Sequence, residues 1–279
     1  MTDNRTNKTA NVPAASAAAK AGNASGTPAA QKTRNVKIIV QYDGSRYRGW
    51  QRLSDCELTI QGKLEQLLLK LTGQNIEVIG SGRTDADVHS VGQTANFHIA
   101  TELNDYELLK EINHYLPDDI AVTKLETVPE LFHSRYNAVS KWYRYRVWNS
   151  RIPNVFERKY MYQFPHRLDI SAMQKAAELM CGTHDFLPFS SLKKSRKSTV
   201  RTVSRIGISR SGDEIIFDFY GDGFLYNMIR IMTGTLLEVG IGERNPESIS
   251  RIFEEGLRSD AGVLVPGKGL CLMEVSYKR

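Results

Sequence analysis

Segments with strand-like and helix-like patterns alternate along this chain in an order that few folds accommodate. Between residues 36 and 128 the order is strand, helix, strand, strand, helix, strand, and a similar order repeats between residues 141 and 277 with one additional short helix after Asn245-Pro246. This order is typical of ferredoxin-like sheets with mainly antiparallel strands. We therefore predict an α+β protein, α/β-like in its alternation, built of two ferredoxin-like (RRM-like) lobes that are pseudo-duplicated in topology and leave a central cleft.

Capping signals fix the two helices of the first half. Thr59 precedes apolar residues at helical spacing and Gly73 follows them, so a helix is expected between these residues. Asn104 and Glu107 are spaced as in a capping box, and Pro117 ends the second helix. The remaining predicted elements are strands at 36–42, 75–79, 93–99, 119–128, 141–148, 200–209, 214–220 and 270–277, and helices at 171–181 and 224–239.

Composition separates a tail from the rest of the chain. Residues 1–34 contain ten alanines and no Leu, Ile, Phe, Tyr or Trp, so they lack the apolar surface that folding requires. We predict a disordered tail at 1–34, a first lobe at 35–138 with the site, and a second lobe at 139–279. The tail has five basic residues and one acidic one, so it carries +4 of the net charge of +6. Global charge is therefore weak support for a nucleic-acid partner.

Cysteine usage and hydropathy bear on location. The three cysteines lie far apart in sequence, which argues against a disulfide framework and for a reducing compartment. No apolar run approaches the ~20 residues of a membrane span, and the tail lacks the amphipathic face of a transit peptide. We expect a cytoplasmic protein without a membrane partner.

The loop at residues 80–90, with the sequence GSGRTDADVHS, is longer and more charged than a strand pair needs. Loops of this kind often carry sites. A solvated connection is the simplest interpretation. Asp85, Asp87 and His89 could instead ligate a metal, but no other Asp/His cluster supplies further ligands.

Two other interpretations use the first aspartate of the loop. An aspartyl-phosphate site would place that aspartate at the end of an apolar strand, whereas Ser-Gly-Arg-Thr precedes it. Alternatively, Asp85 acts as nucleophile or base, with the Arg83 guanidinium keeping the carboxylate ionised.

An ordered set of motifs between residues 36 and 277 carries a family resemblance. The motifs are Tyr42-Asp43-Gly44-Ser45, Gly49-Trp50-Gln51-Arg52, Gly82-Arg83-Thr84-Asp85-Ala86-x-Val88-His89 with Gly92-Gln93 and Phe97, Phe132-His133-Ser134-Arg135, Trp142-Tyr143-Arg144-Tyr145, His184-Asp185-Phe186 and Phe224-Leu225-Tyr226-Asn227-Met228-Ile229-Arg230. Together they resemble the tRNA pseudouridine synthase A family.

The resemblance implies a function. Members isomerise uridine to pseudouridine at positions 38 to 40 of the tRNA anticodon stem-loop and act as homodimers, so tRNA and a second copy are the expected partners. The isomerisation moves no electrons and donates no group, so no cofactor and no metal are expected. The alternative is a catalytically impaired RNA-binding relative of the same fold. A glycosidase-like hydrolase that pairs Asp85 with Asp87 is disfavoured because adjacent loop carboxylates would need separations of ~5 to 9 Å.

The same motifs also imply roles for individual residues. The resemblance makes Asp85 the catalytic residue and Arg230 its ionic partner. It makes Tyr143 the side chain that stacks on the flipped uracil, with C5 proton transfer as a candidate role, and Arg83 the residue that helps displace the target nucleotide. His89 is expected to be structural.

One position departs from the family pattern. Where the family typically has glycine, this chain has Asp87. Aspartate tolerates positive φ better than most residues, so the loop conformation is expected to survive. Its carboxylate could raise the pKa of Asp85 or repel RNA phosphate.

Two basic features favour RNA. Residues 193–205 carry six basic side chains and no acidic one, and we predict that Lys193, Lys194, Arg196 and Lys197 contact phosphates; a solvated surface is the alternative. In the strand 141–148, Tyr143 and Tyr145 share one face and the arginines share the other, so that core packing competes with base stacking as the role of the tyrosines.

Overall fold

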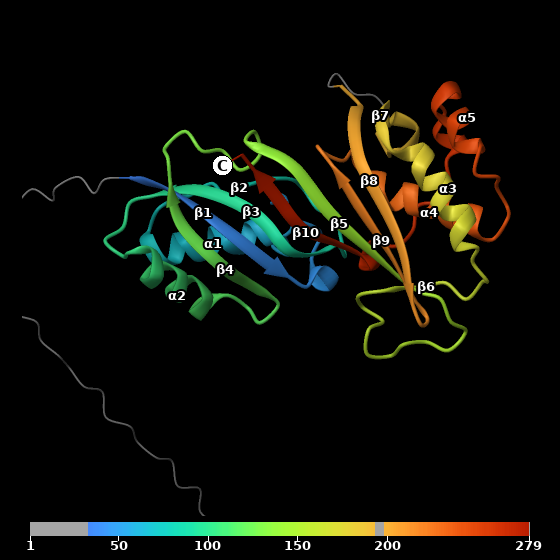
Figure 1. The fold of residues 1–279 in the computed structure, drawn as a ribbon. Helices are drawn as coiled ribbons and strands as arrows, with labels where there is room; N and C mark the ends of the chain where they lie inside the picture. The colour runs from blue at the N-terminus through green and yellow to red at the C-terminus, as the bar shows by residue number, and fades with distance from the viewer. Residues whose placement is uncertain (1–32, 193–197, 279) are drawn as a thin grey trace, which may run out of the picture. The chain divides into compact units, whose positions relative to one another are not determined.

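The computed structural model describes residues 33–192 and 198–278 (Figure 1). Its strands are β1 (Arg34–Tyr42), β2 (Ile79–Gly80), β3 (His89–Ile99), β4 (Ile120–Val128), β5 (Ala138–Trp148), β6 (Tyr162–Gln163), β7 (Gly182–Asp185), β8 (Val200–Ser211), β9 (Glu214–Gly221) and β10 (Leu270–Tyr277). Its α-helices are α1 (Ile60–Thr72), α2 (Asp105–Tyr115), α3 (Ile170–Met180), α4 (Met228–Gly240) and α5 (Ser248–Glu255). Most of the predicted tail, residues 1–32, lies outside the described residues.

The strands of the described residues form one ten-stranded sheet. Their order is β4-β1-β3-β10-β5-β9-β8-β7, with β2 paired to β3 and β6 to β5. Only the β10–β3 and β5–β6 pairings are parallel. The prediction of a mixed α+β protein with a mainly antiparallel sheet is therefore confirmed.

The central strand of this sheet comes from the end of the described chain. Leu270–Tyr277 pairs with β5 over most of its length, and Cys271 and Leu272 pair with His89 and Ser90 at the start of β3. The strands of the first half thus reach those of the second half through β10.

Two clusters of buried side chains lie against the sheet. One joins β1 and β3 to α1 and α2, with Ile38, Phe97 and Leu64 at its centre. The other joins β5 and β9 to α3 and α4 and includes Phe217 and Met173. Figure 1 shows α1 and α2 beside the first set of strands and α3 to α5 beside the second.

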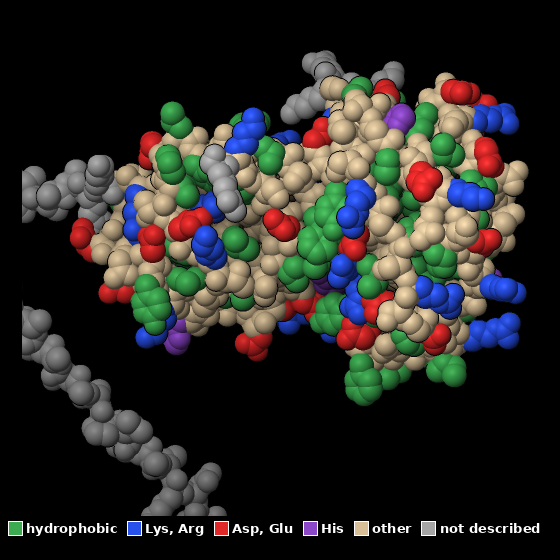
Figure 2. All heavy atoms as spheres, in the orientation of Figure 1, with side chains coloured by type: hydrophobic (Ala, Val, Ile, Leu, Met, Phe, Trp, Pro, Cys, Tyr) green, Lys and Arg blue, Asp and Glu red, His purple; other side chains and the backbone are tan. Residues whose placement is uncertain are grey.

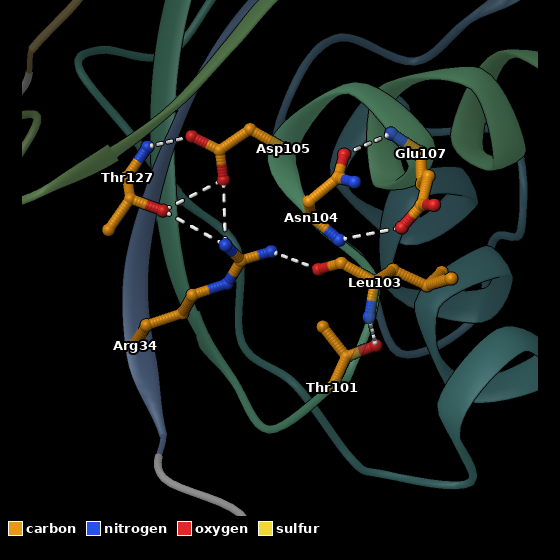
Figure 3. Close-up of polar contacts among 7 residues, drawn as sticks. All are labelled: Arg34, Thr101, Leu103, Asn104, Asp105, Glu107 and Thr127. Atoms are coloured by element: carbon orange, nitrogen blue, oxygen red, sulfur yellow. Dashed lines mark hydrogen bonds and ion pairs between the residues drawn. The ribbon is translucent and has the colours of Figure 1, made fainter.

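The predicted caps are present. The Thr59 hydroxyl accepts a hydrogen bond from the Gly62 N–H, and Gly73 ends α1 in the left-handed conformation. At α2, Asn104 and Glu107 form a reciprocal capping box, drawn in Figure 3. Both helices therefore begin where the sequence predicts.

The start of β1 is tied to the start of α2. Arg34 donates hydrogen bonds to Asp105 Oδ1 at 2.8 Å, to Thr127 Oγ1 at 3.1 Å and to the Leu103 carbonyl at 2.6 Å, and Figure 3 shows its guanidinium between these acceptors. Composition places Arg34 in the tail, but its backbone pairs with Ile99 of β3 and its side chain has fixed acceptors, so the sheet begins one residue before the predicted end of the tail.

Four predicted starts differ from the structure by three or more residues. Two of these are β3, which begins at His89 rather than at residue 93, and β5, which begins at Ala138 rather than at residue 141. Residues 75–78 form no strand, because the Val78 N–H donates to the buried Glu65 carboxylate at 3.0 Å and only Ile79 and Gly80 pair with β3. The helix predicted from Phe224 begins at Met228, because Asn227 adopts a left-handed conformation with φ of 62°. A helix cannot continue through that residue.

None of the helices in residues 33–192 and 198–278 is long and apolar enough to cross a membrane. All three cysteines are free thiols.

Candidate active site

The charged loop, residues 81–88 between β2 and β3, is fixed just before its aspartate. The Thr84 carbonyl accepts a hydrogen bond from the Trp50 N–H at 3.1 Å, and the Thr84 hydroxyl lies 2.8 Å from the Tyr42 hydroxyl. The backbone at Gly49 passes so close that a Cβ there would lie 2.5 Å from the Thr84 carbonyl oxygen. The position of Asp85 is therefore set by both the backbone and the side chain of its neighbour.

The end of the loop is held by a buried histidine. His89 Nδ1 accepts a hydrogen bond from the Gly44 N–H at 3.0 Å, so Nε2 carries the proton that it donates to the Lys159 carbonyl at 3.1 Å. Burial lowers the pKa of His89 despite the Asp43 carboxylate. Both ring nitrogens are occupied, so His89 is no metal ligand here, and its expected structural role is supported.

Asp87 lies in the turn between Thr84 and His89, the two residues of the loop region that are held by hydrogen bonds. Its φ is 63°, the left-handed conformation expected where the family has glycine, and its side chain is exposed. Its carboxylate acts on the pKa of His89, which it raises, whereas the pKa of Asp85 responds to burial and Arg230. The concern that Asp87 perturbs Asp85 directly is thus not supported by the electrostatics.

Asp85 faces an arginine from the second half of the chain. Arg230 Nη1, in the first turn of α4, lies 3.5 Å from Asp85 Oδ2, and the two side chains are 15% and 23% exposed. The guanidinium also donates to the Val265 carbonyl at 2.8 Å and to Asn227 Oδ1 at 2.9 Å. These bonds hold it in one orientation in front of the carboxylate.

Burial dominates the electrostatics of Asp85. Loss of solvation raises the pKa of Asp85, and the Arg230 charge partly offsets that increase. The idea that Arg83 keeps the carboxylate ionised is wrong, because Arg83 is exposed and the charge that acts on Asp85 belongs to Arg230. A carboxylate that is poorly solvated and faces a single fixed cation suits nucleophilic or base catalysis.

Tyr143 lies on β5 next to this pair. It is 7% exposed, and its ring meets that of Phe224 edge to face at 5.4 Å between centroids. Burial, together with the nearby Asp85 carboxylate, raises the pKa of Tyr143. Its hydroxyl is therefore protonated at neutral pH. Its neighbour on the same face, Tyr145, is fully buried in the core.

These residues meet in a cleft of about 1260 Å³. Asp85, Arg83, Tyr143 and Arg230 all line it, so the structure brings together four of the eight predicted site residues. The other four, Lys193, Lys194, Arg196 and Lys197, lie outside the described residues. The described neighbours of that run, Leu192 and Ser198, line the cleft.

Sequence reasoning missed three residues of the site. Asn227 orients Arg230, Trp50 holds the loop, and Lys141 lines the cleft. Asn227 and Trp50 could have been identified from the sequence, because both belong to motifs that carry the family resemblance. For Lys141 the sequence gives only a weak indication, which is that it lies two residues before Tyr143 and therefore on the same face of the strand. Within the described part of the chain, no group of three or more His, Cys, Asp and Glu could hold a metal ion.

Comparisons with known proteins agree with this site. A family model described as tRNA pseudouridine synthase matches residues 38–137 and 176–278. The tRNA pseudouridine synthase A of Bacillus sp. (strain KSM-64) is 47% identical over 243 residues, which is 87% of this chain and 99% of that protein. The tRNA pseudouridine synthase A 1 of Clostridium tetani is 45% identical over 244 residues, 88% of this chain and all of that protein.

A chain in a solved Cbf5-Nop10-Gar1 complex also matches, over 73% of this chain and 45% of its own, at 13% identity and a TM-score of 0.35. A likeness that weak bears on neither fold nor function. The family model, in contrast, extends over both halves of the chain and includes the segments that carry Asp85 and Arg230, and the curated relatives match 87 to 88% of the chain. The chain belongs to the tRNA pseudouridine synthase family.

Proposed function

We propose that this protein isomerises uridine to pseudouridine at positions 38 to 40 of the tRNA anticodon stem-loop. The observation that carries the proposal is the pairing of Asp85 with Arg230 beside Tyr143, in a cleft large enough for an extruded nucleotide. The reaction detaches uracil from C1′ of its ribose and reattaches it through C5. All atoms of the substrate are retained, so a carboxylate is the only reagent that the chemistry requires.

Asp85 is the proposed catalytic residue. It either attacks C1′ and forms a bond to the sugar, or removes the proton at C2′ to give a glycal. Both routes begin with the ionised carboxylate. The Arg230 guanidinium favours that form against the effect of burial, and its bonds to Val265 and Asn227 keep it from moving with the substrate.

Tyr143 and Arg83 are proposed to handle the base. A buried tyrosine ring beside the carboxylate gives the flipped uracil a surface on which to stack. Because its pKa is raised, its hydroxyl stays protonated and can donate a hydrogen bond, but it needs a partner that takes its proton before it can act as the base at C5. Arg83 is exposed at the rim of the cleft, where a guanidinium can occupy the space that the extruded nucleotide leaves.

Mapping pseudouridine in an unmodified tRNA transcript after incubation with the protein tests the proposal. New pseudouridine at 38, 39 or 40 is expected. Bound but unmodified tRNA would indicate the impaired RNA-binding relative instead. The φ of 63° at Asp87 supports activity, since the loop keeps a conformation that glycine would also adopt.

We also propose that the protein works as a homodimer in the cytoplasm. Support comes from the family and from a sheet face where Trp142 stacks on Tyr220 at 5.6 Å and Arg144 and Arg205 lie over the two rings. Aromatic and arginine side chains are enriched at interfaces. Figure 2 shows apolar side chains gathered near β5 beside basic ones. Sedimentation equilibrium of the wild type and of Trp142→Ala tests this; a monomeric wild type would refute it.

Three finer expectations remain proposals. The division into lobes at 35–138 and 139–279 is supported by the two separate clusters of buried residues, one drawn from the first half of the chain and the other mainly from the second half, including β10. The duplicated ferredoxin-like topology is supported by the repeated strand and helix order. Contact of Lys193, Lys194, Arg196 and Lys197 with RNA is supported by their charge and by the cleft position of Leu192 and Ser198. Alanine replacement of the four should flatten the salt dependence of tRNA binding.

A further inference from the structure

Lys141 is a mostly buried cation in the wall of the cleft. It lies near the start of β5, where it pairs with Gly221 of β9 and Val275 of β10. Its ammonium donates one hydrogen bond, to the Ser81 carbonyl at 2.9 Å, and lies so close to Gly82 that a Cβ there would be 2.7 Å from Nζ. The group has three protons to donate, and one has a protein acceptor among the described residues.

Two further cations share this wall. Arg135, in the turn before β5, and Arg201, near the start of β8, both line the cleft with Lys141. Burial and these two guanidiniums lower the pKa of Lys141 to about 8. Each of the three comes from a different segment, so the fold itself brings the like charges together.

Within residues 33–192 and 198–278 no carboxylate forms an ion pair with these three cations; Asp85, which lines the same cleft, is paired with Arg230, and Asp222 accepts a hydrogen bond from the Thr202 N–H. The ion pairs of the described chain include neither Lys141 nor Arg135 nor Arg201. The segment 193–197, Lys-Lys-Ser-Arg-Lys, has no acidic side chain to offer. Burying a cation without a partner is unfavourable, and clustering three of them adds repulsion. Such an arrangement is stabilised when an anion binds.

We propose that Lys141, Arg135 and Arg201 form a subsite for one backbone phosphate of the RNA substrate. The proposal rests on the function proposed above. Lys141 and Tyr143 are two residues apart on the same face of β5, so their side chains start ~7 Å apart. A phosphate held at Lys141 therefore belongs to the target nucleotide or an immediate neighbour.

This position gives the subsite a second consequence. The same ammonium holds the Ser81 carbonyl, and Gln93 donates to the Gly82 carbonyl at 2.9 Å. These are the two peptide units that precede Arg83. A phosphate bound at Lys141 is thus linked, through this ammonium, to the backbone segment that carries Arg83.

Binding of an unmodified tRNA transcript at 50 and 200 mM salt tests the subsite. All proteins carry Asp85→Asn, so no turnover occurs during the measurement. In this background Lys141→Met should reduce the slope of log K against log salt by about 0.7 to 0.9, so its affinity loss should be about 3-fold larger at 50 mM than at 200 mM. Lys175→Met, at an exposed lysine of α3 that does not line the cleft, should leave the slope unchanged. Lys141→Arg should restore it.

RNA stem-loops with single neutral methylphosphonate linkages identify the phosphate. A methylphosphonate at one linkage beside the target uridine should weaken RNA binding by the Asp85→Asn protein that retains Lys141. The same linkage should not weaken binding further when Lys141→Met is also present. The subsite would be overturned if Lys141→Met left the slope of log K against log salt unchanged; a loss of affinity with that unchanged slope would mean that Lys141 only supports the Ser81 carbonyl. It would also be overturned if the losses of affinity caused by Lys141→Met and by a methylphosphonate were additive at every linkage. Pseudouridine formation by the wild type tests the function separately, so the two failures are distinguishable.

Discussion

Replacing Arg230 by methionine should destabilise the protein because it leaves Asp85 without its counter-charge. Methionine keeps much of the volume of the side chain and removes the ion pair at 3.5 Å together with the bonds to Val265 and Asn227. Removing one member of a buried pair costs about 3 to 5 kcal/mol. The two side chains are 15% and 23% exposed, so screening places the cost at the low end, about 3 kcal/mol.

The cost should depend on pH with a defined sign. Burial raises the pKa of Asp85 and Arg230 lowers it. Without Arg230 the folded-state pKa is higher still, so the ionised carboxylate is least tolerated at neutral pH. As pH falls through this pKa the carboxyl takes up a proton, and the difference between variant and wild type shrinks. The acid limb of the rate profile should move to higher pH for the same reason.

Urea unfolding at pH 7 and at pH 4.5 measures both effects. The assay uses wild type, Arg230→Met, Asp85→Asn and the double variant, so that the coupling between the two side chains is isolated from the other bonds of Arg230. For a folded unit of this size a loss of 3 kcal/mol lowers Tm by roughly 6 to 12 °C. A destabilisation by Arg230→Met that is equal in both backgrounds and at both pH values would refute the pairing.

Three further predictions concern the loop and the start of β1. Asp85→Asn should reduce pseudouridine formation by at least ~10³-fold while filter-retained tRNA stays near the wild-type level, because Asn is a far weaker nucleophile and base; retained turnover would remove Asp85 from the mechanism. Asp87→Gly should keep the acid limb of the rate profile in place, since burial and Arg230 set the pKa of Asp85; a displaced limb would show that the two carboxylates interact. Deleting residues 2–32 should leave Tm unchanged, whereas deleting 2–34 should cost about 1 to 2 kcal/mol through the hydrogen bonds of Arg34; equal Tm values would show that Arg34 anchors nothing.

Local signals predicted those parts of the fold that local chemistry decides. The caps of α1 and α2 lie at Thr59 and Asn104 as expected because a side chain satisfies backbone groups three residues away. The prediction of a strand at 75–79 was wrong for residues 75–78, because a hydrogen bond there is made to a residue outside the segment. Glu65, thirteen residues earlier, takes the Val78 N–H, and no pattern within the segment shows this.

For the candidate site, too, some features could be predicted from the sequence and others depend on tertiary structure. Motif resemblance located Asp85, Tyr143 and Arg230 in one cleft, and the structure agrees. It did not give the direction of the Asp85 pKa, because burial depends on packing from both halves of the chain. Lys141 was not predicted for a related reason. A lysine in a strand is usually exposed, and only tertiary structure shows that its ammonium contacts the Ser81 carbonyl and has no acidic partner among the described residues.

The position of β10 in the sheet has a consequence for biosynthesis. The ribosome makes the other nine strands of the described sheet first. Until residues 270–277 have emerged, the edge of β5 from Ala138 to Tyr145 has no partner strand, and His89 and Ser90 at the start of β3 lack theirs. Long bare edges are templates for pairing with other nascent chains. Asp85 precedes β3 and Arg230 belongs to the second half, so the ion pair between them also depends on the two halves coming together. We therefore expect the polypeptide to be most prone to aggregate before this last strand is made.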